Sequence, residues 1–484
     1  MGLSGEKRIV AIGLFAAYTA WMPAHATEYY LDCAGADARS GASPEQAWQS
    51  LAKAGGATLL PGDKLLLKRG CAWTGPLTLT ASGTEGAPIH IGPYGIGADP
   101  EIHDGNPANV TIKGDWIAIE SLTVRSKPVA TDPGCGDQPV GSRSGFTFAA
   151  GSSHNSVSHS LSAGHSMGVW LAAGSAHNRV LACVIKDNVS LTVNDQANPD
   201  NDAGAFGILV NGDSNEVAYN TLQNNLAWCS YDYGTDGSSV EIYNAKGNRI
   251  HHNRSLEEGT FTELGGARTA DNVFARNLVV SASEACIFLN VRGPGSKWGP
   301  NTGTVAANNT VYLTGTKSQG IVCTGDCAPD ILDLRNNIIW SEWKAVYVDG
   351  QPREDHNIFW KTGGNPLIQN LTVAVTSKRV DPRFTEASHG DFHPAAGSPA
   401  LDAGDAEAAG FAGDRDLDGI AVPAGAAADM GAFERPAGAP LIGHAQAGKG
   451  EAGISYRIFG AGAGWRFGKA RPGIPAADAT GARK

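Results

Sequence analysis

The chain has few charged and few aromatic residues, and its charge balance is negative. Of its 484 residues, 18% are charged and 7% are aromatic, and the net charge is −11 at pH 7. Nucleic acids and anionic membranes are bound by clustered Lys and Arg, so this charge argues against both as partners. It also disfavours a strongly anionic polysaccharide, unless a cation or a local basic patch intervenes.

The chain also lacks the regularly spaced leucines of a leucine-rich solenoid, and its cysteines do not have zinc-site spacing with histidines nearby. A different repeat is present, an N-x-apolar-x-x-N phrase that occurs at 215–220, 248–253 and 272–277. Fainter copies have their second position at Ser160, Cys183, Asn309, Asn337 and Asn357. Neighbouring copies are 23 residues apart from 160 to 183, 24 from 253 to 277 and 20 from 337 to 357. These periods are typical of a β-solenoid.

Short strand-forming runs alternate with this phrase, for example 145–148, 168–171, 207–210, 240–243 and 345–348. A single coil cannot bury its apolar face, so stacked coils must build a continuous core. Asn suits a bend because it tolerates a left-handed conformation and can bond to its copy in the next coil. On these repeats the chain resembles the secreted right-handed parallel β-helix proteins over roughly residues 110–390, which implies an all-β fold. Lyases, hydrolases, epimerases and adhesins share that fold, so function must come from a site.

The sequence predicts five segments. Lys7 and Arg8 precede an apolar run, and Ala24-His25-Ala26 is a small-x-small cleavage site, so residues 1–26 are predicted to be a secretory signal peptide. No later run is apolar enough to span a bilayer, which predicts a secreted or periplasmic protein. The others are an N-terminal cap with the first coils (27–109), the β-helix (110–390), a C-terminal capping segment (391–434) and a low-complexity tail (435–484).

All eight cysteines follow the predicted cleavage site, and an exported compartment would let them pair. We expect disulfides between Cys33 and Cys71, between Cys323 and Cys327, and between Cys135 and Cys229. Cys183 occupies a position of the Asn repeat, so we expect a buried free thiol there.

A pair of carboxylates is the main candidate for chemistry. Strand alternation turns Val240 and Ile242 inward and Glu241 outward, and Glu263 has the same phase in the next coil. Two carboxylates about 5 Å apart on neighbouring strands cannot both ionise cheaply, so one should keep its proton. A retaining glycosidase needs such a pair as its acid and nucleophile, and a slightly wider pair would suit an inverting enzyme. The alternative is an external ion-pair ladder in which Lys246 and Arg268 neutralise the two glutamates.

Insertions at about 126–144, 191–203 and 226–237 interrupt the coils in one stretch, and loops of this size are often functional. The last one supplies aromatic faces for sugar stacking and two further carboxylates. The predicted substrate-binding residues are Trp170, Trp228, Tyr231, Tyr233, His251 and His252, and the reserve acids or bases are Asp232 and Asp236. The alternatives are a loop packed down by its own aromatics and a His pair that only hydrogen-bonds a bend.

Two phrases suggest calcium. Asp414, Asp416 and Asp418 match the first half of a calcium loop, although Gly425 replaces the Glu of its twelfth position, and an Asp-rich turn held by its own hydrogen bonds is an equal alternative. Residues 241–246 resemble the Glu-Ile-x-x-x-Lys phrase of β-helical lyases of the chondroitinase B and alginate lyase type. That resemblance implies a calcium ligand at Glu241 and a base at Lys246. The family's Arg is absent at Leu264, with Arg268 nearby.

The sequence therefore predicts a secreted enzyme that degrades a polysaccharide, with a glycoside hydrolase favoured. That reaction requires no cofactor. A calcium-assisted lyase acting on a uronate-containing glycan, and a non-catalytic glycan-binding or adhesin β-helix, remain open. The helix could act as a monomer or a homotrimer.

Overall fold

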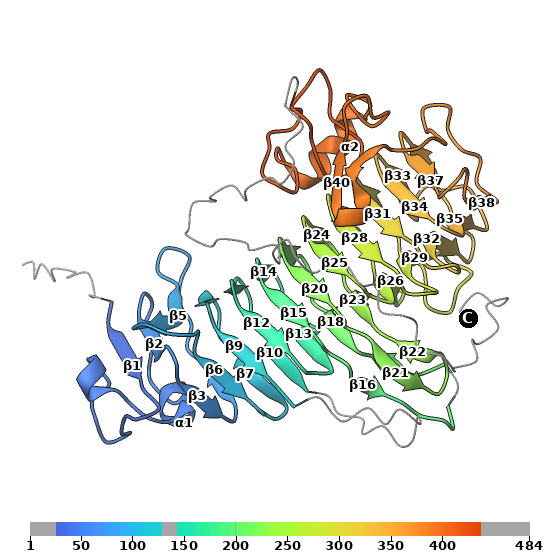
Figure 1. Cartoon of the computed structure of the whole chain (residues 1–484). Coiled ribbons are helices and arrows are strands. Elements are labelled where there is room, and N and C mark those ends of the chain that lie inside the picture. Colours follow the sequence, from blue (N-terminus) through green and yellow to red (C-terminus); the bar gives the residue numbers. More distant parts are fainter. Residues whose placement is uncertain (1–25, 128–142, 199, 437–484) are drawn as a thin grey trace, which may run out of the picture.

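The computed structural model describes residues 26–127, 143–198 and 200–436. Three long sheets of parallel strands run side by side along a single axis, and the chain visits sheets A, B and C in turn in each coil. Figure 1 shows these coils stacked in order along the sequence. The prediction of a right-handed parallel β-helix is confirmed.

The strands of the three sheets are short. Sheet A contains β1 (Glu28–Leu31), β2 (Lys64–Lys68), β5 (Ile89–Tyr94), β8 (Ile117–Glu120), β11 (Ser156–Ser158), β14 (Arg179–Leu181), β19 (Glu216–Ala218), β24 (Arg249–His251), β27 (Val273–Ala275), β30 (Thr304–Ala307), β33 (Leu332–Arg335) and β36 (Arg353–Asp355). Sheet B contains β3 (Ala72–Thr74), β6 (Glu101–His103), β9 (Thr123–Arg125), β12 (Leu161–Ala163), β15 (Val184–Lys186), β20 (Thr221–Gln223), β25 (Arg254–Leu256), β28 (Leu278–Ser281), β31 (Thr310–Leu313), β34 (Ile338–Ser341) and β37 (Ile358–Trp360). Sheet C contains β4 (Leu77–Leu79), β7 (Ala108–Ile112), β10 (Ser144–Phe148), β13 (Met167–Leu171), β18 (Phe206–Val210), β23 (Ser238–Tyr243), β26 (Thr260–Gly265), β29 (Ile287–Arg292), β32 (Gln319–Thr324), β35 (Lys344–Val348) and β38 (Leu367–Gln369).

In the described residues, three 3-10 helices (Pro44–Gln46, Ala387–His389 and Gly410–Ala412) lie outside the three sheets. So do three hairpins and two short α-helices. They are β16 (Leu191–Val193) with β17 (Ala203–Gly204), β21 (Ala227–Ser230) with β22 (Gly234–Asp236), β39 (Phe384–Glu386) with β40 (Asp391–Pro394), α1 (Leu51–Gly55) and α2 (Ala406–Ala409). Neither helix approaches the length or the apolar character of a membrane span, in the part of the chain that the structure describes. The predicted signal peptide is residues 1–26, of which all but Ala26 lie outside the described ranges.

The core runs through the middle of the coils, because each strand points alternate side chains inward. In β23 and β18 the inward residues Val240, Ile242, Ile208 and Val210 are fully buried. Burial of this kind contributes about 25 cal/mol for each Å² of apolar surface, and each coil buries its own face against the next.

Buried asparagines form ladders at the bends, as the repeat predicted. Asn253 Oδ1 accepts hydrogen bonds from the backbone N–H and the side-chain amide of Asn220, both at 3.0 Å. Asn253 in turn donates from its backbone N–H and from its side-chain amide to Asn277 Oδ1 in the following coil. The repeating amide therefore holds each coil to the next.

The structure corrects one detail of this bend. The left-handed residue precedes the ladder Asn, with φ of 60° at Tyr219, 54° at His252 and 53° at Arg276. The Asn was expected to occupy the left-handed position itself. Its amide is needed inside the coil instead, so the preceding residue makes the sharp bend.

Two predicted disulfides are confirmed, Cys33–Cys71 and Cys323–Cys327, and Cys183 is a buried free thiol as expected. Cys286 is a second buried free thiol. The expected Cys135–Cys229 pair involves residue 135, which lies outside the described residues.

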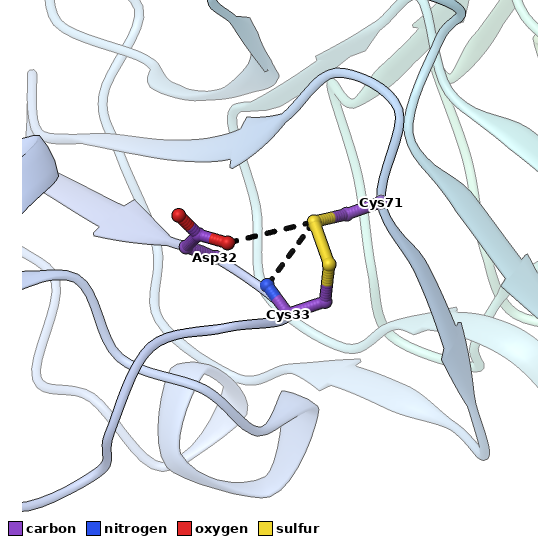
Figure 2. A group of neighbouring side chains, drawn as sticks. All are labelled: Asp32, Cys33 and Cys71. Atoms are coloured by element: carbon purple, nitrogen blue, oxygen red, sulfur yellow. Dashed lines mark hydrogen bonds between the residues drawn. A yellow bond between two sulfur atoms is a disulfide. The ribbon is translucent and has the colours of Figure 1, made fainter.

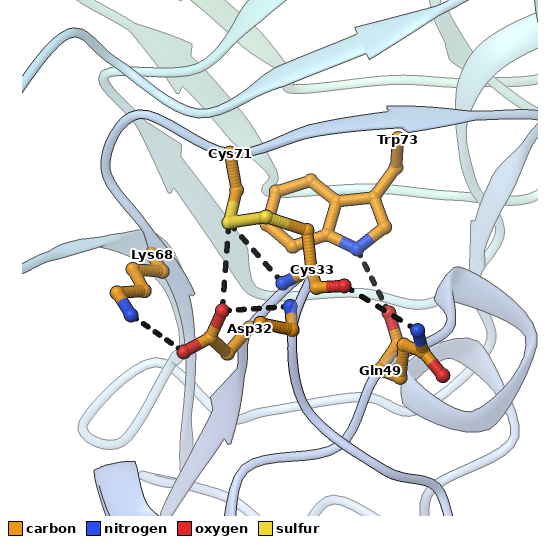
Figure 3. The surroundings of a disulfide bond; sticks show 7 residues. Asp32, Cys33, Gln49, Lys68, Cys71 and Trp73 are labelled. Carbon is orange, nitrogen blue, oxygen red and sulfur yellow. Dashed lines mark hydrogen bonds and ion pairs between the residues drawn. A yellow bond between two sulfur atoms is a disulfide. The ribbon is translucent and has the colours of Figure 1, made fainter.

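Cys33–Cys71 ties β1 to the turn after β2 at the N-terminal end, as Figures 2 and 3 show. Asp32 lies beside it, where its carboxylate pairs with Lys68 Nζ at 2.6 Å. These three residues are also the one group in the described residues where three side chains that could bind a metal lie together: Asp32, Cys33 and Cys71. Because both thiols form the disulfide, this cluster is structural.

The C-terminal segment lies along the flank of the helix, beside sheets A and B (Figure 1). Phe392, Leu417 and Phe433 pack against Leu278 and Tyr312 of sheet B. Arg249 Nη2 of sheet A donates to the carbonyl of residue 411 at 2.7 Å. These contacts all involve sheets A and B, so the search for a site turns to sheet C.

Candidate functional site

The two predicted glutamates lie side by side on the outward face of sheet C. Glu241 on β23 and Glu263 on β26 are direct partners in the parallel register. Their inward neighbours Val240, Ile242 and Leu264 are fully buried, which fixes both carboxylates outward. The predicted juxtaposition of the pair is therefore present in the structure.

A buried arginine that the sequence analysis did not select completes the pair. Arg292, the last residue of β29, pairs with the Glu263 carboxylate and donates to the carbonyl of Leu264. Its side chain is 7% exposed, against 23% for Glu263. Burial alone would lower the pKa of Arg292, but the charge of Glu263 and the hydrogen bond to it raise the pKa. The guanidinium therefore stays charged and favours the ionised form of Glu263.

Glu241 has a different environment. Burial first, and then the negative charges of Glu263 and Asp236, raise the pKa of Glu241 well above its ordinary value. Arg292 and a hydrogen bond from Ser238 Oγ at 3.2 Å oppose this shift without cancelling it. The two carboxyl groups therefore differ: the pKa of Glu241 is raised, while Glu263 has the charged Arg292 as its partner.

The alternative of an external ion-pair ladder does not match the contacts of Arg268 and Lys246. Arg268 forms a bidentate pair with Asp213, with both N–O distances at 2.9 Å, and Lys246 donates its backbone N–H to the same carboxylate at 3.0 Å. Both residues lie in the turn beyond β23 and β26, because the chain bends toward sheet A after Tyr243 and Gly265. Their side chains are therefore separated from the glutamates by that bend.

Two hairpins stand beside the pair, each inserted immediately before a strand of sheet C. Figure 1 shows β16, β21 and β22 at the lower edge of the helix, next to β18 and β23. Asp202 joins the hairpins by accepting from Ser230 Oγ at 2.7 Å and from the backbone N–H of Asp232 at 3.0 Å. Asp232 Oδ2 accepts from the backbone N–H of Asn201 at 2.8 Å. Asp232 therefore links the two hairpins. Asp236 is the hairpin carboxylate whose negative charge contributes to the raised pKa of Glu241.

The predicted aromatic residues divide into two groups. Trp170 lies on the same outward row as Glu241, two strands away, and donates from Nε1 to Asn211 Oδ1 at 2.8 Å. Trp228 and Tyr231 of the hairpin are 44% and 42% exposed. Tyr233 donates from its hydroxyl to Asp200 Oδ1 at 2.5 Å, so it links the second hairpin to the first.

One aromatic pair was missed from the sequence. Trp298 follows β29, and its ring packs edge-on to Tyr243 with centroids 6.1 Å apart. Both rings are attached near the ends of sheet C strands, opposite the hairpins. The one signal in the sequence is that both residues are aromatic. Their contact could not be predicted, because it depends on a loop that folds back over two coils.

The histidine pair is placed elsewhere. His251 and His252 are buried beside sheet A, where their Nδ1 atoms are 2.8 Å apart. His251 Nε2 bonds Glu216 at 3.2 Å, and His252 Nε2 bonds the carbonyl of Arg415 at 3.0 Å. Burial lowers the pKa of His252 to about 4. The two rings therefore bond to sheet A and to the C-terminal segment. They do not lie near Glu241.

The predicted calcium loop has a donor set that does not fit a cation. Asp416 accepts from the backbone N–H groups of residues 418, 420 and 434. Asp418 pairs with Arg254 at 2.7 Å and with His393 at 2.8 Å. Burial alone would lower the pKa of His393, but hydrogen bonds to Asp391 and Asp418 raise it to about 9. Two positive groups thus already neutralise the carboxylate, and the open alternative of a hydrogen-bonded turn describes residues 414–418.

Comparisons with known proteins support the architecture. No protein-family model matches the sequence, and no curated protein matches it. The structure is similar to that of pectate lyase Pel9A, with a TM-score of 0.52 and 15% identity over 84% of this chain and 96% of that one. It also matches a rhamnogalacturonan lyase (TM-score 0.46, 13% identity, 75% of this chain and 92% of that chain). A third match is the GH136 lacto-N-biosidase from Eubacterium ramulus (TM-score 0.45, 15% identity, 73% and 67%).

At these identities the likeness concerns the fold, and any chemistry must be argued from this chain's own side chains. The chain is a right-handed parallel β-helix protein with a carboxylate pair and a buried arginine on the outward face of sheet C.

Proposed function

We propose that the protein is a glycoside hydrolase that cleaves a polysaccharide with Glu241 and Glu263. The observation that carries the proposal is the unequal environment of two adjacent carboxyl groups. One is raised in pKa by burial and by its neighbours, and the other pairs with a buried arginine. An acid and an anion side by side are what glycosidic bond cleavage requires.

Each residue has one role in this proposal. Glu241 gives its proton to the glycosidic oxygen as the bond to the anomeric carbon breaks, and Glu263 attacks that carbon. Water then displaces Glu263 from the sugar, with Glu241 taking a proton from the water. Strands about 4.8 Å apart suit the close carboxylates of a retaining enzyme. Arg292 holds Glu263 in its anionic form between turnovers.

A polysaccharide substrate is supported by the surroundings of the pair. Trp170 shares the outward row, and Trp228 and Tyr231 expose flat rings on the neighbouring hairpin. Aromatic faces of this kind stack on sugar rings. The shared fold with a pectate lyase agrees with this substrate class. Two disulfides fit an exported protein, as degradation of an extracellular polymer would need.

The lyase alternative has less support. It needs calcium at Glu241 and a base at Lys246, yet Lys246 lies in the turn beyond β23. In the described ranges, one group of three potential metal-binding side chains is present, formed by Asp32, Cys33 and Cys71. It lies in the first coils, far in sequence from Glu241 and Glu263. Hydrolysis by two carboxyl groups requires no metal.

The test is product analysis on a panel of xylan, arabinan, galactan, polygalacturonate and alginate, with and without chelator. We expect oligosaccharides that carry an added water, formed equally with chelator present. Glu241→Gln and Glu263→Gln should each reduce turnover by at least about 100-fold. Glu284→Gln, which alters a surface pair with Lys317, is the matched control.

Other outcomes would redirect the proposal. Unsaturated products would establish elimination and turn attention to Lys246. Full activity in both glutamine variants would refute the assigned roles. No product from any polymer would favour a glycan-binding protein.

A further inference from the structure

Lys344 lies on the outward face of sheet C with its ammonium group over two aromatic rings. It is the first residue of β35, whose residues Ala345 and Val346 are fully buried. Lys344 and Tyr347 are partly exposed and therefore point outward. Lys344 Nζ lies 3.9 Å from the ring centroid of Trp343 and 4.6 Å from that of Tyr347. We name these three residues the lysine–aromatic cluster.

The contacts of Lys344 differ from those of the lysines that form ion pairs. Five described lysines have a carboxylate oxygen within 4 Å of Nζ: Lys64, Lys68, Lys186, Lys297 and Lys317. Lys344 has no such partner among the described residues, and burial lowers its pKa. A neighbouring carboxylate would raise the pKa instead. The cluster therefore holds a partly desolvated positive charge that the described part of the chain does not neutralise.

The register neighbours of the cluster are uncharged. Gln319 on β32 is the partner of Lys344, and Gln369 on β38 is the partner of Tyr347. Both amides are partly exposed, and amides can donate to and accept from sugar hydroxyls. Leu367, the partner of Lys344 on β38, is 47% exposed. These positions do not repel an anion that approaches Lys344 Nζ.

The cluster is separate from the carboxylate pair. Figure 1 shows β35 between β32 and β38, toward the C-terminal end of the helix. In the parallel register, Tyr347 follows Glu263 by three strands, through Asn290 and Val322. Three strand spacings amount to about 14 Å. A single sugar unit at the cluster is therefore too short to reach Glu241 or Glu263.

We propose that the lysine–aromatic cluster is a second glycan site, which binds an anionic sugar unit of a polysaccharide. The carboxylate or sulfate group of that unit pairs with Lys344 Nζ, and its C–H groups lie on the accessible parts of the Trp343 and Tyr347 rings. The net charge of −11 disfavours an anionic polymer in general, so such a ligand needs a local positive group of this kind.

The first test compares polygalacturonate with the same polymer after chemical reduction of its carboxyl groups. The full chain carries Glu241→Gln, so that neither polymer is consumed during the titration. Adding Lys344→Gln should weaken binding of the acidic polymer about fivefold and leave binding of the reduced polymer unchanged. Lys344→Arg keeps the charge and should retain most of the affinity.

Lys113→Gln is the matched control, because it removes one positive charge from an exposed residue directly after β7. Equal weakening by Lys113→Gln and Lys344→Gln would mean that only the net charge matters, and it would overturn the site. Unchanged binding in Lys344→Gln would also overturn it, since the lysine would then only pack on its own rings.

The aromatic part of the cluster has its own variant. Tyr347→Leu removes a ring and keeps an apolar side chain on the strand, so it should weaken binding of polygalacturonate severalfold at an unchanged melting temperature. Full affinity in Tyr347→Leu would contradict the role assigned to the rings.

Alginate and a sulfated galactan distinguish the two kinds of anion. An effect of Lys344→Gln on polygalacturonate and alginate alone would assign a carboxylate, and an effect on the sulfated galactan alone would assign a sulfate ester. Failure of all three polymers to bind would overturn the second site.

Hydrolysis is measured separately, so that this proposal and the proposed function can fail independently. Lys344→Gln in the otherwise native chain should cleave a short oligosaccharide with unchanged kcat/KM. A loss there would place Lys344 in the site of the carboxylate pair and overturn a separate site. Binding without any hydrolysis by the native chain would refute the proposed function and leave the second site standing.

Discussion

At the scale of single residues, the difference between Glu241 and Glu263 comes from one neighbour. Both glutamates face outward from adjacent strands, but only Glu263 reaches the guanidinium of Arg292. The remaining carboxyl feels two negative charges and partial burial, and it keeps its proton. A symmetric sequence pattern thus gives an asymmetric pair, which is the condition for acid and nucleophile roles.

Arg292→Met is predicted to lower kcat/KM by at least about tenfold, since the ionised form of Glu263 loses its partner. Ionisation of Glu263 would then need a higher pH, so the acidic limb of the pH–rate profile should move upward. Arg292→Lys should restore part of the activity, as it keeps the charge but not the two-pronged geometry. Arg268→Met is the control, and an equal loss there would refute the special role of Arg292.

The residue level was only partly predictable from sequence. Alternation of Val240 and Ile242 was enough to place Glu241 outward, and the phase of the next coil placed Glu263 beside it. Arg292 could not be distinguished from Arg268 in this way. Arg268 is nearer in sequence, but the chain bends after Gly265 and carries it to Asp213, while Arg292 ends a strand that pairs directly with that of Glu263.

At the scale of elements, buried ladders hold the coils in register. Besides the predicted Asn ladder, another at the bend before sheet C consists of Asn188, Asn225 and Glu258. It was missed because the hairpins stretch its spacing to 37 and 33 residues and because its last member is Glu. Glu258 accepts from the backbone N–H of Asn225 at 2.7 Å and from its amide at 2.6 Å. A residue type that breaks the pattern is thus tolerated where its oxygens replace those of Asn.

This substitution predicts a pH-dependent stability. Burial raises the pKa of Glu258 to about 8, whereas in the unfolded chain Glu258 should titrate near its ordinary pKa of 4.5. Between these values the folded state holds a proton that the unfolded state has lost, so stability should fall as pH rises, by roughly 1.4 kcal/mol per pH unit at most.

The measurement is thermal unfolding at several pH values from 4 to 9. Glu258→Gln keeps one of the two accepting oxygens and removes the titration, so its melting temperature should depend less on pH in this window, whatever its absolute value. Glu284→Gln, at an exposed surface pair with Lys317, serves as the control. Parallel curves for wild type and Glu258→Gln would show that Glu258 does not set the trend.

At the scale of the whole molecule, a stack of coils is weakest at its ends, because a terminal coil has only one neighbour. The Cys33–Cys71 bond ties a 38-residue separation at the N-terminal end, whereas Cys323–Cys327 ties only 4 residues within a loop. In the chain-entropy view, the first contributes about 4 kcal/mol and the second about 2 kcal/mol. The two disulfides therefore allow an internal comparison.

Replacing Cys33 and Cys71 together by Ala should lower the denaturant midpoint more than replacing Cys323 and Cys327 together. Urea unfolding followed by circular dichroism measures both. A larger loss for the short loop would mean that the N-terminal end is held by its packing and not by the disulfide. Neither change should alter the product pattern, since neither bond touches Glu241 or Glu263.

The overall architecture was the most predictable level, because a 20–24-residue period with buried Asn admits few folds. The position of the C-terminal segment was not predictable in the same way. The sequence indicates an apolar face in this segment, formed by Phe392, Leu417 and Phe433. It does not indicate that this face packs against the side of sheet B. The packing partner is sheet B because Leu278 and Tyr312 point outward from their coils. Predicting that orientation would require the register of every coil in the stack.

The constant rise of the coils also sets distances along the outward face of sheet C. Each coil adds about 4.8 Å along the axis. The number of coils between Trp170 and Glu241 therefore fixes how far apart these two side chains lie along the axis. Inserting one whole coil between β13 and β18 would lengthen that distance by one step and leave Glu241 and Glu263 side by side.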